Sequence, residues 1–317
     1  MTGFPISILL GVISMRVFVT GASGFVGSAV VRELMGAGHE VVGLARSDNS
    51  AAALRAAGAQ VHRGDLDDLD SLRRGAEAAD GVIHTAFKHD FSNIAASGVI
   101  DLHAIEAMGS VLEGTGKPFV NTSAFLVEPG IYATEEDAAH PDSVAPFRVP
   151  SEEATLALAD RGVRASVLRL PPSVHGRDDG AFVPKLIDIA RDTGVSATID
   201  AGTNLWPAVH RLDAARLYRL ALEKADPGTR IHAIGDEGVP LHAIATAIGQ
   251  GLGLPVVQVA AAEAAAHFGW FAHFIALDLR ASSALTQQRL GWKPEQPDLL
   301  TDLAEGHYFE EGRRSFL

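Results

Sequence analysis

The 317-residue sequence has no cysteine, and its acidic residues outnumber its basic ones. Without cysteine, disulfides, thiolate nucleophiles and cysteine-bound zinc are excluded, and a cytoplasmic location is expected. With 26 Lys and Arg residues against 39 Asp and Glu residues, the formal net charge is -13. We therefore expect neither a basic surface for nucleic acid nor adhesion to anionic membrane lipid.

A long hydrophobic run is also missing. Residues 4–13 are mostly apolar, but they are fewer than the roughly 20 residues that a membrane-spanning helix needs. No Lys or Arg precedes them and no small-residue cleavage site follows them, which disfavours a signal peptide. We expect residues 1–14 to be a flexible N-terminal extension and the folded chain to begin at Met15.

The short motifs of several enzyme classes are absent as well. The 13 histidines include no His-Glu-x-x-His sequence and no paired ligand spacing, so no metal site is predicted. No Gly-x-Ser-x-Gly elbow is present, which disfavours a Ser-His-Asp hydrolase. Because there is no tandem repeat, low-complexity tract or long linker, we expect one compact folded unit.

What the sequence does contain is a strand pattern that leads into three evenly spaced glycines. Residues 17–20 are mostly β-branched or aromatic without alternation, which is typical of a strand buried on both faces of a parallel sheet. Gly21 would permit a tight turn, Gly24 the approach of backbone to a pyrophosphate, and Gly27 close packing of the next helix. The phosphates would bind the free N–H groups at the start of that helix. The pattern predicts a dinucleotide site formed by Gly21, Ala22, Ser23, Gly24, Phe25, Val26 and Gly27.

Strand and helix patterns then alternate along the chain. The alternation predicts an α/β fold with a doubly wound parallel sheet of the Rossmann type. Ser151 and Asp213 are predicted to cap two of the helices. The expected strands cover residues 40–44, 60–63, 81–84, 118–122, 163–170 and 230–234, and the expected helices cover residues 28–35, 51–57, 69–78, 98–109, 151–159, 182–190, 214–223, 240–251 and 260–274.

The Gly-x-x-Gly-x-x-Gly spacing, preceded by Thr20 and followed by an apolar helix, resembles the short-chain dehydrogenase/reductase superfamily, in its atypical and extended epimerase/dehydratase-like branch. The similarity continues through the turn at residues 171–176 and the stretch at 202–213 to about Pro294. It implies a Rossmann domain of residues 15–170 plus 208–235. A smaller C-terminal substrate-binding cap would consist of residues 171–207 plus 236–317.

The end of the second strand bears on the choice of cofactor. It reads Ala45-Arg46-Ser47 and lacks the carboxylate that usually binds the ribose hydroxyls of NAD. Arg46 and Ser47 would instead bind a 2′-phosphate through charge-assisted hydrogen bonds, so NADP is favoured over NAD. The alternative is that Arg46 is only solvated.

The resemblance adds further cofactor contacts. It places Asp65 and Leu66 beside the adenine and the turn at residues 85–87 near the nicotinamide ribose. Lys88 follows that turn at the edge of the sheet where ligands bind. The full set of these expected contacts is Asp65, Leu66, Thr85, Ala86, Phe87, Lys88, Pro172 and Val174.

Catalysis in the resembled family uses a Tyr-x-x-x-Lys motif, and this sequence lacks it. Its three tyrosines are followed four residues later by Glu, Leu and Gly. The resemblance assigns Ser123, which follows the strand at 118–122, to bonding the reacting carbonyl or hydroxyl. Tyr132 is the tyrosine closest in sequence to the missing motif and is the candidate replacement acid. His89 and His175 are further candidates for proton transfer, with a structural histidine as the alternative for each.

Residues near the expected cleft are predicted to contact the substrate. Arg148 would hold a substrate carboxylate or the nicotinamide ribose. The segment 260–274 places His267, Trp270, Phe271 and Phe274 at helical spacing, either in the core or along the pocket. The complete set of expected substrate contacts is His89, Arg148, His175, Trp206 and His210.

Two classes of function remain open. The first is an NADP-dependent oxidoreductase or epimerase, in which hydride moves between nicotinamide and a small carbonyl or hydroxyl compound held beside Ser123. The second is a catalytically silent NADP-binding sensor or scaffold, since cofactor binding alone does not establish chemistry. The presence of Ser123 and of a polar, aromatic cleft favours the enzyme. A small-molecule substrate and, by analogy with relatives, a homodimer are expected.

Overall fold

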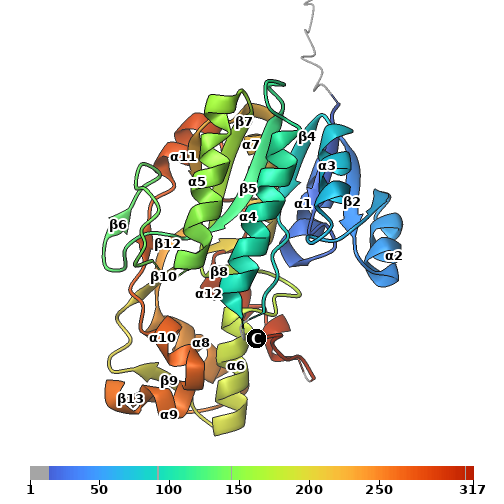
Figure 1. The fold of residues 1–317 in the computed structure, drawn as a ribbon. Coiled ribbons are helices and arrows are strands. Elements are labelled where there is room, and N and C mark those ends of the chain that lie inside the picture. The colour runs from blue at the N-terminus through green and yellow to red at the C-terminus, as the bar shows by residue number, and fades with distance from the viewer. Residues whose placement is uncertain (1–13, 91–92, 144, 311) are drawn as a thin grey trace, which may run out of the picture.

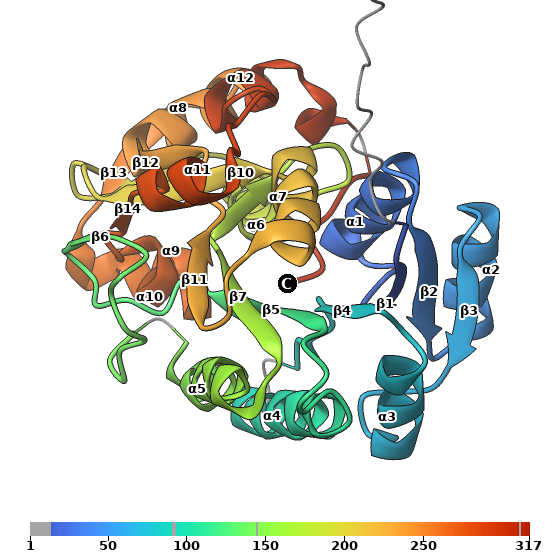
Figure 2. The same cartoon turned by 90° about the horizontal axis from the view of Figure 1, so that it is seen from above.

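A seven-stranded parallel sheet forms the frame of the molecule (Figures 1 and 2). The computed structural model describes residues 14–90, 93–143, 145–310 and 312–317. The expected extension, apart from Ser14, lies outside the described residues. The strand order is β11-β7-β5-β4-β1-β2-β3, and neighbouring strands are parallel throughout. The strands are β1 (Arg16–Thr20), β2 (Glu40–Ala45), β3 (Gln60–Arg63), β4 (Gly81–His84), β5 (Pro118–Ala124), β7 (Arg164–Leu170) and β11 (Thr229–His232).

Helices cover both faces of this sheet, which confirms the predicted α/β doubly wound fold. One face packs against α1 and α7, and the other against α3, α4 and α5 (Figure 2). The apolar side chains of β1 alternate between the two layers, because Val17 and Val19 belong to the first core and Phe18 to the second. The helices are α1 (Phe25–Gly36), α2 (Asp48–Ala56), α3 (Leu69–Glu77), α4 (Ile94–Ser110), α5 (Val149–Ala157) and α7 (Arg211–Lys224).

A second group of elements, here called the cap, lies beyond the carboxyl ends of the strands (Figure 1). It has its own apolar core, to which Trp206 and Phe271 contribute. Its helices are α6 (Phe182–Thr193), α8 (Leu241–Leu252), α9 (Ala264–Phe268), α10 (Ala272–Ile275) and α12 (Leu299–Ala304). Its strands are β8 (Ser173–His175), β9 (Ser196–Ile199), β10 (Leu205–His210), β12 (Asp236–Pro240) and β13 (Val256–Val259). The short strands β6 (Tyr132–Ala133) and β14 (Arg280–Ala281) pair beside it, and α11 (Ala284–Leu290) packs against α7 and β11.

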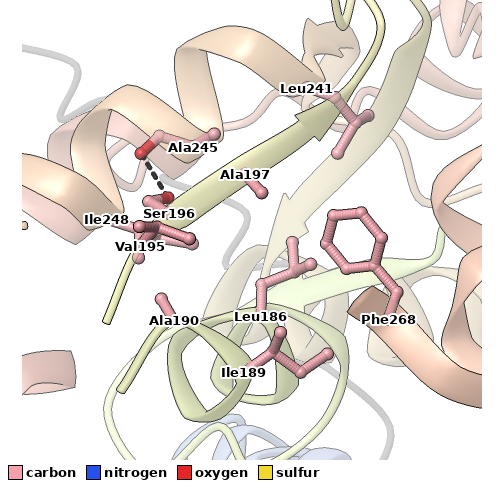
Figure 3. Close-up of a pocket in the computed structure, with 10 residues that line it drawn as sticks. All are labelled: Leu186, Ile189, Ala190, Val195, Ser196, Ala197, Leu241, Ala245, Ile248 and Phe268. Carbon is pink, nitrogen blue, oxygen red and sulfur yellow. Dashed lines mark hydrogen bonds between the residues drawn. The ribbon is translucent and has the colours of Figure 1, made fainter. Parts of the chain in front are cut away.

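The interior of the cap contains a small apolar gap between α6, β9 and α8 (Figure 3). Leu186, Leu241 and Phe268 are among the side chains that surround it. Its one side-chain hydroxyl, that of Ser196, donates a hydrogen bond to the carbonyl oxygen of Ala245 at 2.7 Å. The gap is therefore a packing feature of the cap core, with its polar group already satisfied.

Three local predictions are wrong, each for a stereochemical reason. The helix expected over residues 260–274 is broken, because Gly269 adopts φ 57 between α9 and α10. Ser151 does not cap α5, because the helix already begins at Val149 and places Pro150 in its first turn, where a missing N–H is tolerated. Asp213 does not cap α7, since the ring of His210 accepts from the N–H of Leu212.

Among the described residues, no helix combines the length and the apolar composition that crossing a bilayer requires.

A buried ion pair joins α5 to the sheet. The guanidinium of Arg169 on β7 donates to both carboxylate oxygens of Glu152, at 3.1 and 2.5 Å, and both side chains are fully buried. Arg230 on β11 donates to the same carboxylate at 3.0 Å. Burial raises the pKa of Glu152, but the two arginines outweigh this effect and lower it.

Replacing Glu152 with glutamine should destabilise the fold, because Arg169 would keep a buried charge without its counter-ion. We expect Glu152→Gln to lower the free energy of unfolding by about 3 kcal/mol, measured by urea denaturation. Glu153→Gln, at the exposed neighbouring position on the same helix, is the matched control and should change it by less than about 0.5 kcal/mol. Equal effects of the two substitutions would contradict this account.

Candidate functional site

A cleft of about 1280 Å³ opens between the carboxyl edge of the large sheet and the cap. Its walls come from the turns after β1, β2, β3, β4 and β5, from the 3-10 turn Pro146–Arg148 before α5, and from α6, β10 and α10. Ligands of open parallel sheets bind at this edge, where strand order changes direction. The cleft is therefore the candidate functional site.

The glycine-rich loop after β1 forms one end of the cleft. Gly21 has φ 66, and a Cβ there would lie 2.7 Å from the backbone nitrogen of Ala86. A Cβ on Gly27 would lie 2.1 Å from the carbonyl oxygen of Gly21. Gly24 is the N-cap of α1 and provides no side-chain cap, so first-turn N–H groups of the helix have no capping acceptor. This loop is a backbone cradle that fits a diphosphate.

The cleft is lined by most of the predicted loop residues. Of the predicted set, Ala22 is the exception. Ala22 is buried beneath the loop, where its Cβ packs against β2: a Cβ added to Gly43 would lie 3.0 Å from the Cβ of Ala22. The side chain of Ala22 therefore packs in the core. The lining residues from this loop are Gly21, Ser23, Gly24, Phe25, Val26 and Gly27.

Arg46 lines the cleft at the end of β2 and is exposed. In the part of the chain that the structure describes, no acidic side chain pairs with it. Ser47, predicted to share its ligand, does not line the cleft: its hydroxyl accepts from the N–H of Ser50 at 3.1 Å as the N-cap of α2. Ser50 lines the cleft instead.

The turns after β3 and β4 bring the other expected cofactor contacts to the same wall. Lys88 forms ion pairs with Asp65, at 3.7 Å, and with Asp67. Its charge is therefore already balanced by two carboxylates. The predicted residues of these two turns that line the cleft are Asp65, Leu66, Thr85, Ala86, Phe87 and Lys88, and Pro172 and Val174 line it from the turn after β7 and from β8.

Ser123 lies at the end of β5 on the wall of the cleft. It is buried, and its hydroxyl has no hydrogen-bond partner among the described residues. A buried hydroxyl without a partner costs about 1–3 kcal/mol. Such an atom at the wall of a cleft is a candidate for bonding a ligand oxygen.

Arg148 reaches the cleft from the 3-10 turn before α5 and is buried. Its Nε lies 3.4 Å from Oδ2 of Asp101 on α4, and its Nη2 donates to the carbonyl oxygen of Thr122 at 2.5 Å. The guanidinium carbon lies 4.3 Å from the ring centroid of Phe87. Burial raises the pKa of Asp101, but the charge of Arg148 outweighs it and lowers that pKa. The carboxylate therefore stays ionised and fixes the arginine.

A chain of buried polar groups continues beneath this pair. The ring of His84 on β4 bonds to Asp101 at 3.2 Å through Nε2 and to Oγ1 of Thr20 at 2.6 Å through Nδ1. Thr122, whose carbonyl oxygen accepts from Arg148, bonds through its hydroxyl to the hydroxyl of Tyr218 at 2.6 Å. Sequence analysis did not assign His84 or Tyr218 a role. The available signal was that Thr20 and His84 end adjacent strands, which aligns them at one sheet edge.

The structure does not bring Tyr132 to the cleft, so its prediction as the replacement acid is wrong. Tyr132 lies on β6, is 49% exposed and donates to Glu237 at 2.9 Å. Burial and this hydrogen bond raise the pKa of its hydroxyl. Phe147 lines the cleft with a ring that has no hydroxyl.

The predicted histidines have different environments. His89 lines the cleft, and burial together with the charge of Arg148 lowers its pKa. His175 and His210 do not line it. The Nδ1 atom of His175 bonds to Asp302 at 2.9 Å, and its ring lies 5.3 Å from that of His210, which caps α7. We therefore correct their assignment as substrate contacts; Trp206, the other predicted contact, does line the cleft.

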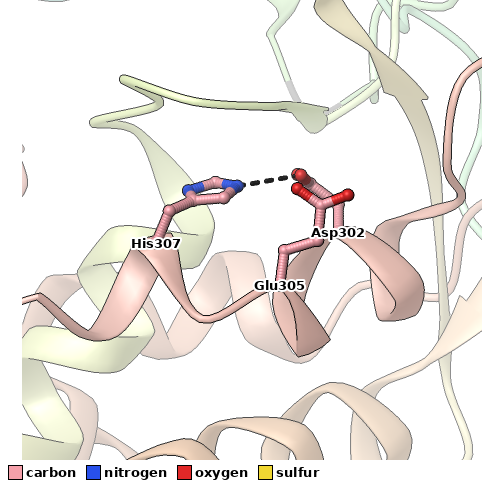
Figure 4. Close-up of side chains that lie close together, drawn as sticks. All are labelled: Asp302, Glu305 and His307. Carbon is pink, nitrogen blue, oxygen red and sulfur yellow. Dashed lines mark hydrogen bonds and ion pairs between the residues drawn. The ribbon is translucent and has the colours of Figure 1, made fainter.

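Asp302 is the centre of a buried polar cluster in the cap (Figure 4). Its two oxygens bond to His175 and to Nε2 of His307, each at 2.9 Å. Burial raises the pKa of Asp302, but these bonds outweigh it and lower the pKa to about 2. Ligand atoms of Asp302, Glu305 and His307 lie within 4.8 Å of one another. Both oxygens of Asp302 already bond to histidine, so the cluster is accounted for as structural.

The cap supplies an apolar lining that sequence analysis identified only in part. Trp270 and Phe274 of the predicted aromatic segment line the cleft, whereas Phe271 is in the cap core and His267 does not line it. The helical spacing predicts that these four side chains share one face, but the break at Gly269 separates His267 from the other three. The other cap residues of the lining include Ala181, Phe182, Leu277, Leu279, Phe316 and Leu317.

Comparisons with known proteins agree with this architecture. The model of the NAD dependent epimerase/dehydratase family matches residues 17–235. An uncharacterized protein of Schizosaccharomyces pombe is 53% identical over 297 residues, which are 93% of this chain and 100% of the relative. The 4-hydroxy-2-methyl-3-oxo-4-farnesyl-3,4-dihydroquinoline-1-oxide ketoreductase of Stigmatella aurantiaca is 28% identical over 270 residues, 80% of each chain. The dTDP-glucose 4,6-dehydratase of Streptomyces venezuelae, solved with NAD and TYD, has a similar fold, with a TM-score of 0.76 and 22% identity over 94% of this chain and 98% of that one.

Asp179, next to the cleft wall, should make the stability of the protein depend on pH. Burial raises the pKa of its carboxyl from 3.8 to about 6. The native state therefore binds more protons than the unfolded state between about pH 4 and pH 6, and stability falls as pH rises through this window. Asp179→Asn removes the titrating carboxyl and with it this loss of stability. From about pH 4 to pH 7 we therefore expect the free energy of unfolding of the variant, minus that of the parent, to rise by up to about 3 kcal/mol.

Chemical denaturation at several pH values measures this difference. The matched control is Asp178→Asn, because Asp178 is the adjacent carboxylate and its side chain is 74% exposed. Its stability should follow that of the parent at every pH. Parallel curves for Asp179→Asn and the parent would show that the Asp179 carboxyl titrates normally.

Proposed function

The chain belongs to the NAD dependent epimerase/dehydratase family, and from that membership we propose that it is an NADP-dependent oxidoreductase acting on a small carbonyl or hydroxyl compound. One observation carries the proposal. The Ser123 hydroxyl and the Arg148 guanidinium line the same cleft as the Gly21–Gly27 loop. A cofactor cradle and a pair of oxygen-binding groups thus share one site.

The cofactor fits the residues present. The uncapped start of α1 and the bare backbone at Gly24 would bind the diphosphate. Asp65 and Leu66 would lie beside the adenine, and the turn Thr85–Phe87 beside the nicotinamide ribose. When bound, the reduced cofactor supplies the hydride that a carbonyl carbon accepts.

Arg46 supports NADP as the cofactor. Its exposed guanidinium lies at the cleft, at the end of β2, where the strand carries no carboxylate. An arginine at this place binds a 2′-phosphate, whereas an acidic residue binds the free ribose hydroxyls of NAD. Its lack of a paired acid among the described residues keeps its charge available.

Ser123 and Arg148 would bind the substrate oxygen. When hydride adds to a carbonyl carbon, the π electron pair moves to the oxygen, which becomes an alkoxide. The Ser123 hydroxyl donates a hydrogen bond to this oxygen, and the fixed charge of Arg148 stabilises the negative charge that develops there. Asp101 holds the guanidinium in place through the buried chain of His84 and Thr20.

The proton that completes the reduction would come from water in the open cleft. Arg148 stays protonated and does not release one. His89 is held mainly neutral, because burial and the nearby guanidinium lower its pKa. Water protonates the alkoxide and leaves hydroxide to the solvent, and oxidation of an alcohol follows the same path in reverse.

A catalytically silent NADP-binding protein is the second candidate. The observation that favours it is that no tyrosine is among the described residues that line the cleft, where Phe147 presents a ring without a hydroxyl. Under this reading Ser123 and Arg148 would have no catalytic task. The second experiment below separates the two candidates.

Arg46→Glu tests the cofactor assignment. The change replaces a cation beside the 2′-phosphate with an anion, so we expect NADPH to bind roughly 10- to 100-fold more weakly, while the affinity for NADH changes little or improves. Titration calorimetry with both cofactors measures this. Arg55→Glu, an exposed arginine on α2 outside the cleft lining, should leave both affinities unchanged. If Arg46→Glu leaves the ratio of the affinities for NADPH and NADH unaltered, Arg46 does not contact the 2′-phosphate.

Ser123→Ala tests the catalytic assignment. Removal of one hydrogen-bond donor to a developing oxyanion should lower kcat/KM by about 100-fold, with the Kd for NADPH unchanged. NADPH oxidation is followed with a panel of aldehydes, ketones and imines. Tyr132→Phe, remote from the cleft, should retain full activity. Tight NADPH binding without turnover of any substrate would favour the silent protein.

A further inference from the structure

We propose that the cap half of the cleft binds an uncharged, apolar ring system, so that the substrates are apolar aryl or alicyclic carbonyl compounds and not phosphate-bearing sugars. This inference rests on the proposed function and specifies its substrate class. The cap half is defined here by its large side chains, Phe182, Trp206, Trp270, Phe274, Leu279 and Phe316.

The lining of the cap half carries no ionisable side chain among the described residues. Its members come from α6, β10, the turn at Gly269–Phe271, α10, and the segments near residues 279 and 316, and all of them are aromatic or aliphatic. Elements far apart in the sequence thus contribute the same kind of side chain to one wall. Such a surface binds apolar ligand area and gives no partner to a charge.

The rings of this wall contact one another. The centroid of Phe182 lies 5.5 Å from that of Phe274 and 6.1 Å from that of Trp206, with tilts of 30° and 57°. Trp270 meets Phe274 edge to face at 5.8 Å. Clusters in these geometries present both ring faces and ring edges, which suits an additional ring from a ligand.

Two large apolar side chains of the wall remain open to solvent. Trp270 is 48% exposed and Phe316 is 63% exposed. Phe316 lies over Gly180 at the start of α6, and its ring centroid is 6.3 Å from that of His89 on the opposite wall. Exposed apolar groups that gather at the mouth of a cleft mark a binding surface.

The cations that line the cleft lie outside the cap half. Lys88 pairs with Asp65 and Asp67, and Arg148 pairs with Asp101. Arg46 lies at the end of β2, on the cofactor side. A substrate diphosphate in the cap half would therefore have no unpaired arginine or lysine to bind.

The N-terminus of α6 also opens on the cap half, but it does not suit a phosphate. Asp179 lies just before it and accepts the N–H of Ala181 at 2.8 Å. The third residue of the helix, Pro184, has no N–H to donate. A carboxyl group already occupies this helix start.

The orientation of a bound substrate follows from these walls. Its carbonyl oxygen would lie between Ser123 and Arg148, while its apolar part extends toward Phe182 and Phe274. Phe87 and Phe147, whose rings stack at 6.1 Å, line the cleft beside Arg148. The apolar surface therefore begins at the reacting centre and continues into the cap.

A matched pair of aldehydes tests the inference. In 4-isopropylbenzaldehyde and 4-carboxybenzaldehyde, groups of similar size differ in charge, and UDP-glucose serves as the phosphate-bearing probe. We expect kcat/KM with NADPH to be at least about tenfold higher for the isopropyl compound than for the carboxylate. Saturation-transfer NMR on the protein saturated with NADP⁺ measures binding without turnover, and we expect a strong signal from the isopropyl compound, a weaker one from the carboxylate and none from UDP-glucose.

Trp270→Lys changes the preference if the cap half binds the substrate. A cation at this partly exposed position should narrow the ratio between the kcat/KM values of the two aldehydes by about tenfold or more. Val256→Lys places the same cation at an exposed apolar position on β13, outside the cleft lining, and should leave the ratio as it is.

The outcomes separate the inference from the proposed function. Equal or better use of the carboxylate, or binding of UDP-glucose to the NADP⁺-saturated protein, would overturn the inference; reduction of propanal, which is too small to reach the cap, would show that the proposed function stays in place. Failure to bind NADPH would overturn the proposed function. In that case the order of the two aldehydes in saturation-transfer NMR without cofactor still decides the inference, because neither aldehyde carries a diphosphate that the empty loop could bind.

Discussion

The close approach of two backbone segments is the constraint on which the site depends. The turn after β1 passes so near the start of α1 and the turn after β4 that a side chain at Gly21 or Gly27 would overlap backbone atoms. This contact sets the uncapped helix start beside the ends of β4 and β5. A diphosphate cradle and the groups at the ends of those strands are thereby fixed at one edge of the sheet.

Buried hydrogen bonds and an ion pair then determine which charged group lies at the cleft wall. Thr20, His84 and Asp101 form a continuous chain from the first strand to α4, and Asp101 positions Arg148 at the cleft wall. An ionised group can stay buried only when it is paired and hydrogen-bonded in this way. The cap needs no such chain, because its share of the cleft is apolar. The two walls therefore divide polar and apolar recognition between them.

The sheet and the cofactor loop were predictable because their signals are local. Buried parallel strands read as unbroken apolar runs, and the glycine spacing has one stereochemical meaning. Two failures depend on partners far along the chain: Tyr132 lies on β6 and donates to Glu237, and His175 bonds to Asp302. The other two depend on where a helix begins: Ser47 accepts from the N–H of Ser50 as the N-cap of α2, and His210 accepts from the N–H of Leu212 as the N-cap of α7.

The cleft wall carries the guanidinium of Arg148 and, among the described residues, no phenol, which has a consequence for the conditions under which the proposed chemistry can operate. Arginine keeps its proton at every pH that the fold tolerates. The polarising charge at the proposed oxyanion position is therefore permanent, and alkalinity does not switch it off. If turnover falls at low or high pH, the cause would then be the supply of protons from solvent or the stability of the fold, and not the ionisation of Arg148.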